Sequence, residues 1–336
     1  MEITSKLNHS YSTNRRLGKE EPIFSTQMTN DKLQVSLFLS PNLMRKAEGG
    51  LRKHGYFKYS THEYLDNKPL NVIPLVTIIT VIFNGEKHIE QTIKSVLSQT
   101  YDNVEYIIID GGSTDRTVDI IAQYDTAIDY WVSEPDQGLY FAMNKGISLA
   151  TGDIIGILNV GDFYECDAIQ NIINYFVNNQ ADYTYGKVVL VNEDGDKCGT
   201  FSPIPKHKIG QAIYYVQPYP HISAFFRRNV YLQEGGFDTN YKVSADHEFS
   251  LRVHTKKYRG IDSGVVIGFV RPAGLSGSAN STKESMEIAI KYGKNKIYVY
   301  ALYRFYVMNR YLASILPNFI VLLIKKIKGS RFQSVS

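Results

Sequence analysis

The chain has 336 residues, 43% of them hydrophobic, so it can bury a sizeable core as one large domain or two modest ones. Its 37 basic and 33 acidic side chains leave a net charge of +4, an excess too small to indicate a nucleic-acid-binding protein. Neither cysteine, Cys166 or Cys198, has a Cys or His neighbour at zinc-ligand spacing, which excludes a disulfide framework and a zinc finger. Residues 1–16 lack the apolar core of a secretory signal peptide, and we expect a cytoplasmic protein.

Strands and helices alternate from residue 75 onwards, a pattern typical of a doubly wound, mostly parallel sheet. Before it, residues 1–70 form a polar, basic extension, with helical pieces expected around 41–53 and a turn at 66–71. The expected elements are, in chain order, strand 75–83, helix 87–98, strand 104–110, helix 114–123, strand 129–133, helix 139–150, strand 154–158, helix 166–178, strands 186–192 and 221–227, a helix holding 245–254 and a strand ending near 270. We predict three regions: the extension at 1–70, the α/β domain at 71–275 and a helical region at 276–336.

The carboxyl-terminal tail has a composition that suits a membrane surface. No segment reaches the roughly 18 consecutive apolar residues of a spanning helix. The tail Ile315–Lys328 instead joins an apolar stretch, broken by Pro317 and Asn318, to three lysines. Such a stretch predicts peripheral contact with an anionic membrane, here at its cytoplasmic face. The alternative is a terminal helix that docks on the protein's own core.

Three acidic residues lie where a predicted strand ends or a predicted helix begins. Asp110 ends the strand at 104–110, Asp162 follows the strand at 154–158, and Asp246 stands beside the start of a helix. Ligands of open α/β sheets bind outside the carboxyl ends of the strands. Each acid alone has a plain alternative as a helix cap or turn former. Together they favour a nucleotide pocket at this edge of the sheet.

These residues belong to three longer runs, VTIITVIFNGEKHIEQTIKSVLSQTYDNVEYIIIDGGSTDRT, AMNKGISLATGDIIGILNVGD and GGFDTNYKVSADHEFSLR. Over roughly Pro74–Ser276 the chain resembles glycosyltransferase family 2, which has the GT-A fold. The resemblance implies an inverting enzyme that moves a sugar from a nucleotide-diphosphate donor to an acceptor hydroxyl. It further implies a saccharide or lipid-linked saccharide acceptor and a part in surface polysaccharide biosynthesis.

The resemblance also implies where the donor binds. Asp110 would accept hydrogen bonds from the base or ribose, and Phe83 would give the base an apolar neighbour. The family usually has two adjacent acids here, and the second position is Gly111 in this chain. As an alternative to donor binding, Lys145 could lie on a solvated helix face. His221 could likewise be a structural histidine. The implied donor-binding residues are Val81, Phe83, Asn84, Asp110, Gly111, Asp136, Asn144, Lys145, Asn159 and His221.

Charge on the departing diphosphate calls for a divalent cation, Mg²⁺ or Mn²⁺. The family's Asp-x-Asp-Asp-like loop reads Asn159-Val160-Gly161-Asp162 here, so the resemblance implies Asp162 as the metal ligand. Inversion needs a general base, and Asp246 in ADHEFSLR matches the family's catalytic position. Its neighbours His247 and Glu248 point in other directions on a helix, which favours Asp246 alone.

Rival functions are weaker or remain as alternatives. A dehalogenase-like phosphatase needs Asp-x-Asp directly after the first strand, where this chain has FNG, and a dinucleotide dehydrogenase needs GxGxxG there. A saccharide- or nucleotide-binding scaffold without catalysis stays open, favoured by Gly111, Phe141, Asn159 and Gly161. The presence of both Asp162 and Asp246 favours the enzyme.

Overall fold

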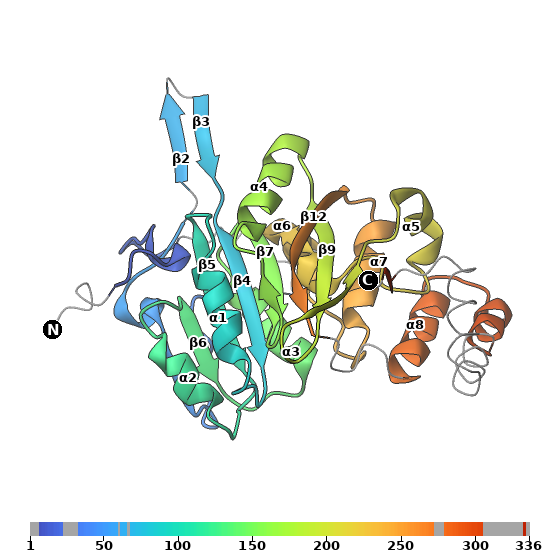
Figure 1. Ribbon diagram of the computed structural model, residues 1–336, viewed down its shortest axis with the longest axis horizontal. Coiled ribbons are helices and arrows are strands. Elements are labelled where there is room, and N and C mark those ends of the chain that lie inside the picture. The colour runs from blue at the N-terminus through green and yellow to red at the C-terminus, as the bar shows by residue number, and fades with distance from the viewer. Residues whose placement is uncertain are drawn as a thin grey trace.

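The protein is built around one large sheet, and the computed structural model in Figure 1 describes residues 7–22, 33–59, 61–65, 68–271, 279–304 and 332–333. The strands are β1 (Ala47–Gly49), β2 (Thr61–Leu65), β3 (Lys68–Ile73), β4 (Val76–Ile82), β5 (Val104–Asp110), β6 (Tyr130–Ser133), β7 (Ile154–Asn159), β8 (Phe163–Tyr164), β9 (Tyr183–Val191), β10 (Lys197–Phe201), β11 (Phe225–Arg227), β12 (Gly260–Val270) and β13 (Phe332–Gln333). The helices are α1 (Ile89–Leu97), α2 (Thr117–Gln123), α3 (Leu139–Leu149), α4 (Ala168–Asn179), α5 (Lys206–Ala212), α6 (Arg228–Glu234), α7 (Ala245–Thr255) and α8 (Ala279–Lys291).

The sheet has 11 strands in the order β1-β6-β5-β4-β7-β11-β9-β10-β13, with β12 paired to β8 and β9. Strands β6, β5, β4 and β7 are parallel to one another, whereas β1, β11, β10 and β13 pair antiparallel with their neighbours. The expectation of a mostly parallel α/β sheet is confirmed. A separate hairpin of β2 and β3 projects beyond the main sheet (Figure 1).

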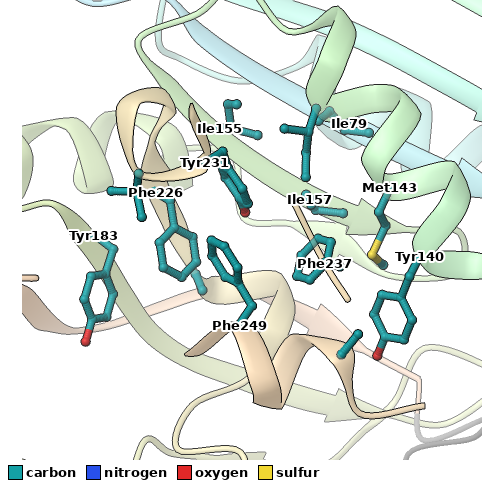
Figure 2. Packing of buried hydrophobic residues seen from close by; sticks show 14 of the residues in the cluster. Ile79, Tyr140, Met143, Ile155, Ile157, Tyr183, Phe226, Tyr231, Phe237 and Phe249 are labelled. Atoms are coloured by element: carbon teal, nitrogen blue, oxygen red, sulfur yellow. The ribbon is translucent and has the colours of Figure 1, made fainter. Parts of the chain in front are cut away.

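Helices cover both faces of the sheet, so its central strands are buried on both sides. Every residue of β4 and β5 is buried, as expected for parallel strands between two helical layers. Alternate residues of β4 enter opposite cores: Ile79 packs with α3, and Ile78 packs with α1 and α4. Figure 2 shows the first of these cores, where Ile79 and Met143 lie near an aromatic group that includes Tyr140, Phe237 and Phe249.

The strand register brings four carboxyl ends to one edge. Ile82 at the end of β4 is paired with Asp110 at the end of β5, and Asp110 with Ser133 at the end of β6. On the other side of β4, Val81 is paired with Asn159 at the end of β7. Residues far apart in the sequence therefore meet at the edge where ligands of such sheets bind.

The segment before residue 70 adds a strand to the sheet, so the expectation of helical pieces at 41–53 is wrong for residues 41–50. β1 pairs with β6, and only a single 3₁₀ turn, Leu51–His54, follows it. Gly50, at φ +100°, turns the chain between the two, because an L side chain rarely adopts that backbone conformation. The backbone N–H groups of Leu51 and Arg52 then donate to the carbonyls of Ile128 and Asp129.

Two buried ion pairs tie this segment to the core. Arg52 Nη2 lies 2.6 Å from Glu105 Oε1, and Lys58 Nζ lies 2.5 Å from Asp129 Oδ2. Burial alone would raise the pKa of Glu105, but the Arg52 guanidinium and the hydroxyls of Thr151 and Thr77 hold it below its ordinary value. The segment thus packs as part of the folded protein, while the proposed boundaries near 70 and 275 stay predictions.

Three further expectations change. Residues 68–71, expected in a turn, begin strand β3, and the turn positions 66 and 67 fall outside the described residues. His221 lies in a 3₁₀ turn, His221–Ser223, and the strand begins only at Phe225, because Pro218 and Pro220 have no N–H to donate to a sheet. The tail Ile315–Lys328 also lies outside the described residues. Among those that are described, no helix combines the length and apolar character needed to cross a bilayer.

Candidate active site

The carboxylate of Asp110 is buried and organises the loop that follows β5. Its Oδ2 accepts hydrogen bonds from the N–H groups of Gly112 and Ser113, at 3.1 and 2.9 Å, and from Ser133 Oγ at 2.6 Å. Its Oδ1 accepts from Ser113 Oγ. Both oxygens are therefore engaged inside the protein, Oδ2 by three donors and Oδ1 by one. We therefore expect Asp110 to position the loop. The sequence had instead suggested that Asp110 contacts the base or ribose.

The loop after β4 is joined to the same structure and leaves an aromatic ring exposed. The Asn84 N–H donates to Ser113 Oγ at 2.8 Å, and Asn84 Oδ1 accepts from the Thr114 N–H at 2.8 Å. Phe83 is 63% exposed, so its ring can contact a ligand. The side chain of Val81, by contrast, is 2% exposed and lies in the core, and its donor-binding role stays a prediction.

Asp136 brings a carboxylate to the position where the family's second acid is missing. A Cβ atom at Gly111 would lie 2.8 Å from Asp136 Oδ2, so this carboxylate occupies the space over Gly111. Asp136 Oδ1 accepts from the Gly138 N–H at 2.8 Å. Burial, together with the nearby negative charges of Asp110 and Glu134, raises the pKa of Asp136. Asp136 thus lies beside Gly111, at the end of β5.

Two α3 residues expected to bind the donor are instead used inside the protein. Asn144 accepts from the Phe237 N–H at 2.8 Å and donates to the Phe237 carbonyl at 2.9 Å. Lys145 Nζ lies 2.8 Å from Glu134 Oε1, and Arg45 lies 3.0 Å from the other oxygen of the same buried carboxylate. The polar groups of Asn144 and Lys145 thus have internal partners, and their donor-binding role stays a prediction.

The turn after β7 carries the Asn159 amide and the Asp162 carboxyl group, and the Arg271 guanidinium contacts it. Asn159 Oδ1 is buried and has no hydrogen-bond partner among the described residues. Burial raises the pKa of the Asp162 carboxyl to about 7, against the opposing effect of the Arg271 backbone N–H and guanidinium. Arg271 Nη1 donates to the Gly161 carbonyl, and its Nη2 donates to Gln91 Oε1 at 2.8 Å.

The same turn fits a divalent cation that takes most of its ligands from elsewhere. The orphaned Asn159 Oδ1 and the Asp162 carboxylate are hard oxygen donors, as Mg²⁺ and Mn²⁺ prefer. Within the described part of the chain no group of three or more His, Cys, Asp or Glu side chains forms a closed metal cage. A bound cation would therefore depend on diphosphate oxygens and water for its other ligands.

Asp246 lies in the first turn of helix α7, and the Tyr140 hydroxyl contacts its carboxylate. The Tyr140 hydroxyl lies 3.0 Å from Asp246 Oδ1 and 2.8 Å from the Val243 carbonyl. Asp246 is half-buried, whereas His247 and Glu248 are buried. His247 Nε2 lies 2.6 Å from the Ile213 carbonyl, so its ring is engaged internally. Of the three neighbours, Asp246 offers the accessible carboxylate.

Glu248 is fixed by cations and a hydroxyl. It lies 2.8 Å from Arg252 and 3.3 Å from Lys291, and it accepts from the Tyr292 hydroxyl at 2.7 Å. A carboxylate with these partners is not free to take a proton from an acceptor.

His221 lies between β7 and the start of α7. Since β11 runs antiparallel to β7 with Phe225 opposite Gly156, the residues before Phe225 extend toward the carboxyl end of β7. The ring of His221 packs against Phe237, with centroids 6.0 Å apart, and its buried Nε2 has no hydrogen-bond partner within the described ranges. Burial lowers the pKa of His221, while the nearby Asp246 carboxylate opposes that shift. A neutral imidazole with a spare nitrogen therefore faces the Asp246 region.

A residue that the sequence gave no reason to select sets the backbone before Asp246. The Glu284 carboxylate, on α8, accepts from the N–H groups of Lys242, Val243 and Ser244 at 2.8 to 2.9 Å. It thereby fixes, from a distant helix, the backbone that leads into α7. No local sequence pattern marks Glu284.

Replacing Glu284 by Gln is expected to lower the free energy of unfolding by about 1–2 kcal/mol. The NH2 group of Gln would face a backbone N–H donor and could not accept its hydrogen bond. Chemical denaturation measures the change. Glu287→Gln is the matched control on the same helix, since Glu287 makes only an exposed contact of 3.9 Å with Lys283. Equal losses for the two variants would contradict the role of Glu284 in holding the backbone before α7.

Comparison with known proteins identifies the family and the fold. The family model described as Glycosyl transferase family 2 matches residues 77–236. An uncharacterized glycosyltransferase of Mycobacterium tuberculosis is 34% identical over 184 residues, covering 53% of this chain and 68% of the relative. A PGL/p-HBAD biosynthesis glycosyltransferase of Mycobacterium bovis is 28% identical over 184 residues, covering 53% and 69%.

Solved structures share the fold at low sequence identity. Staphylococcus aureus TarS 1-349 in complex with UDP-GlcNAc has a TM-score of 0.53 and 17% identity, over 67% of this chain and 69% of that one. The mannosyltransferase PcManGT from Pyrobaculum calidifontis, in complex with GDP-Man and Mn²⁺, has a TM-score of 0.51 and 18% identity, over 76% and 80%. The fold is thus the GT-A glycosyltransferase fold. The chain belongs to glycosyltransferase family 2 and is a glycosyltransferase.

Proposed function

We propose that the protein is an inverting glycosyltransferase that moves one sugar from a nucleotide-diphosphate donor to a hydroxyl of a saccharide or lipid-linked saccharide acceptor, in surface polysaccharide biosynthesis. The observation that carries this proposal is the half-buried Asp246 carboxylate, held by Tyr140 and flanked by the spare nitrogen of His221. A general base beside the edge where nucleotides bind is what an inverting transfer requires.

The donor base would lie at the ends of β4 and β5. Phe83 offers an exposed ring against which a base can stack, and Asp136 offers the carboxylate over Gly111 that accepts base or ribose hydrogen bonds. Asp110 and Asn84 hold the two loops that carry these groups. The donors bound to TarS and PcManGT, UDP-GlcNAc and GDP-Man, support a nucleotide sugar as ligand.

The diphosphate would lie by the turn after β7. Asn159 and Asp162 would hold the divalent cation, Mg²⁺ or Mn²⁺, which when bound acts as a Lewis acid on the leaving group. The Mn²⁺ bound to PcManGT supports this assignment. The Arg271 guanidinium, over the Gly161 carbonyl, adds a positive charge that belongs to the protein itself.

Asp246 would take the proton of the acceptor hydroxyl as its oxygen attacks the anomeric carbon. The new bond to the acceptor oxygen forms as the bond to the diphosphate breaks, and the electron pair of that bond leaves with the diphosphate. Attack from the face opposite the leaving group inverts the anomeric configuration. Tyr140 keeps the Asp246 carboxylate turned toward the acceptor through its hydroxyl contact.

The anomeric configuration of the product tests this proposal. With the donor identified, proton NMR of the new glycosidic linkage during the first turnovers should show a β-linked product from an α-linked donor. A product with the donor's own configuration would contradict the role of Asp246 as base in a single displacement.

Removal of divalent cations is expected to lower the transfer rate at least about tenfold, because the diphosphate would then leave without its Lewis acid. The rate is measured after dialysis against EDTA and after re-addition of Mg²⁺ or Mn²⁺, which should restore it. Calcium re-addition serves as the control for a non-specific ionic effect. An unchanged rate after complete metal removal would assign the diphosphate charge to Arg271 instead.

Membrane contact is part of the same proposal. The tail Ile315–Lys328 would hold the protein at the cytoplasmic face of a membrane, where lipid-linked saccharides are available. Deletion of this tail should lower the membrane-bound fraction in cell fractionation, and an unchanged fraction would remove the tail from the proposal.

A further inference from the structure

Positive charge is concentrated at the carboxyl-terminal end of the chain. The last acidic residue is Glu287, and residues 288–336 contain nine Lys and Arg side chains. Since the whole chain carries +4, residues 1–287 carry −5. Such asymmetry between parts of a chain is typical of proteins that bind an anionic surface through one region.

The described part of this region packs on the segment after α5. The rings of Tyr298 and Tyr215 meet edge to face, with centroids 6.4 Å apart, and Lys294 Nζ lies 3.5 Å from the centroid of the Tyr214 ring. Residues 197–233, which include this segment, contain no Asp or Glu. Two stretches that lack acidic side chains therefore lie side by side.

The residues at this junction expose apolar and aromatic side chains among cations. Residues 296–304 are helical and bury Val299, at 1% exposure, while Ile297 on the opposite side is 81% exposed. Tyr300 and Arg304 follow Ile297 at helical spacing and are also exposed. We define the basic aromatic face by its exposed members: Val216, Lys296, Ile297, Tyr298, Tyr300 and Arg304.

We propose that the basic aromatic face rests on an anionic phospholipid membrane and brings a lipid-linked acceptor to Asp246. Apolar and aromatic side chains enter the headgroup region, and Lys and Arg side chains pair with anionic lipids. A second copy of the chain is a poorer occupant, because a two-fold contact would bring like charges together. A purely polar anion would leave Ile297 and Val216 without a partner.

The position of the face connects it to the site. The Ile213 carbonyl, three residues before Val216, contacts His247 Nε2 at 2.6 Å, next to Asp246. Glu284 on α8, the helix before the face, holds the backbone at 242–244. The delivery of the acceptor rests on the proposed function, whereas membrane binding by the face does not.

Vesicle co-sedimentation of the full chain tests the proposal. The probes are vesicles of phosphatidylcholine alone and of phosphatidylcholine mixed with phosphatidylglycerol. Wild type should bind the mixed vesicles and leave phosphatidylcholine vesicles largely unbound. The variant Lys296→Glu with Ile297→Ser should bind mixed vesicles at least about tenfold more weakly, since each basic residue near such a surface contributes about 1 kcal/mol.

Lys256→Glu with Val177→Ser is the matched control, with one exposed lysine and one 58% exposed apolar side chain away from the face. It should bind as wild type does. Ile297→Ser alone keeps the test valid if the double variant unfolds, because Ile297 is exposed. Equal binding by wild type and the face variant, or no wild-type binding to mixed vesicles, would overturn the proposal.

Activity separates this proposal from the proposed function. The face variant should keep transfer to a water-soluble acceptor and lose transfer to an acceptor embedded in vesicles. If neither acceptor is glycosylated by wild type, the proposed function fails while the vesicle result still decides the role of the face. If the variant transfers equally well to the embedded acceptor, the delivery part of the proposal is wrong.

Discussion

Asp246→Asn is expected to lower the transfer rate by a factor of about 100 to 10,000, because an amide cannot take the proton from the acceptor hydroxyl. The amide has the size of the carboxyl group and can still meet the Tyr140 hydroxyl, so the site should keep its shape. Donor affinity should stay close to that of wild type. Nucleoside diphosphate release gives the rate, and calorimetric titration gives the donor affinity.

Asp238→Asn is the matched control, since Asp238 lies before α7 but pairs with Lys291 at 3.1 Å instead of facing the site. We expect its rate to stay within about twofold of wild type, as for other partly exposed ion pairs. A nearly full rate for Asp246→Asn would contradict the base assignment and direct attention to His221. Loss of both rate and donor binding would place Asp246 in the donor site instead.

Asp110→Ala is expected to lower the free energy of unfolding by about 3–5 kcal/mol, because the change leaves buried N–H and O–H donors without their acceptor. The affected donors are the backbone of Gly112 and Ser113 and the hydroxyls of Ser113 and Ser133. Chemical denaturation followed by circular dichroism measures the loss.

The control for this change is Asp115→Ala in the next loop. Asp115 also accepts backbone N–H bonds, from Glu86 and Thr117 at 3.1 Å, but it is only partly buried, so water can replace it. Its loss should cost about 1 kcal/mol or less. If Asp110→Ala were as stable as wild type and bound donor weakly, the carboxylate would contact the ligand directly.

The central part of the fold could be predicted from the sequence because its signals are local. Buried runs such as those of β4 and β5, separated by an amphipathic helix, predict a parallel sheet, and the ends of β5 and α1 fall within two residues of expectation. β1 could not be predicted, since a three-residue strand has no periodicity of its own and exists because β6 offers an edge.

Only part of the candidate site could be predicted. The rest depends on contacts between residues far apart in the sequence. Asp246 was identified from its motif, and the structure gives it an accessible position. The internal roles of Asn144 and Lys145 depend on Phe237 and Glu134, which only the fold brings near. Likewise, the sequence shows that Gly111 lacks a carboxylate, but only the structure places Asp136 over it.

A panel of nucleotide sugars, each assayed with Mg²⁺ or Mn²⁺ for nucleoside diphosphate release by wild type and by Asp246→Asn, tests the central claim most directly. We expect release from one donor by wild type, stimulated by a saccharide or lipid-linked acceptor, and little release by the variant. Donor binding without release by either protein, even with acceptors present, would contradict an enzymatic role and favour a binding scaffold.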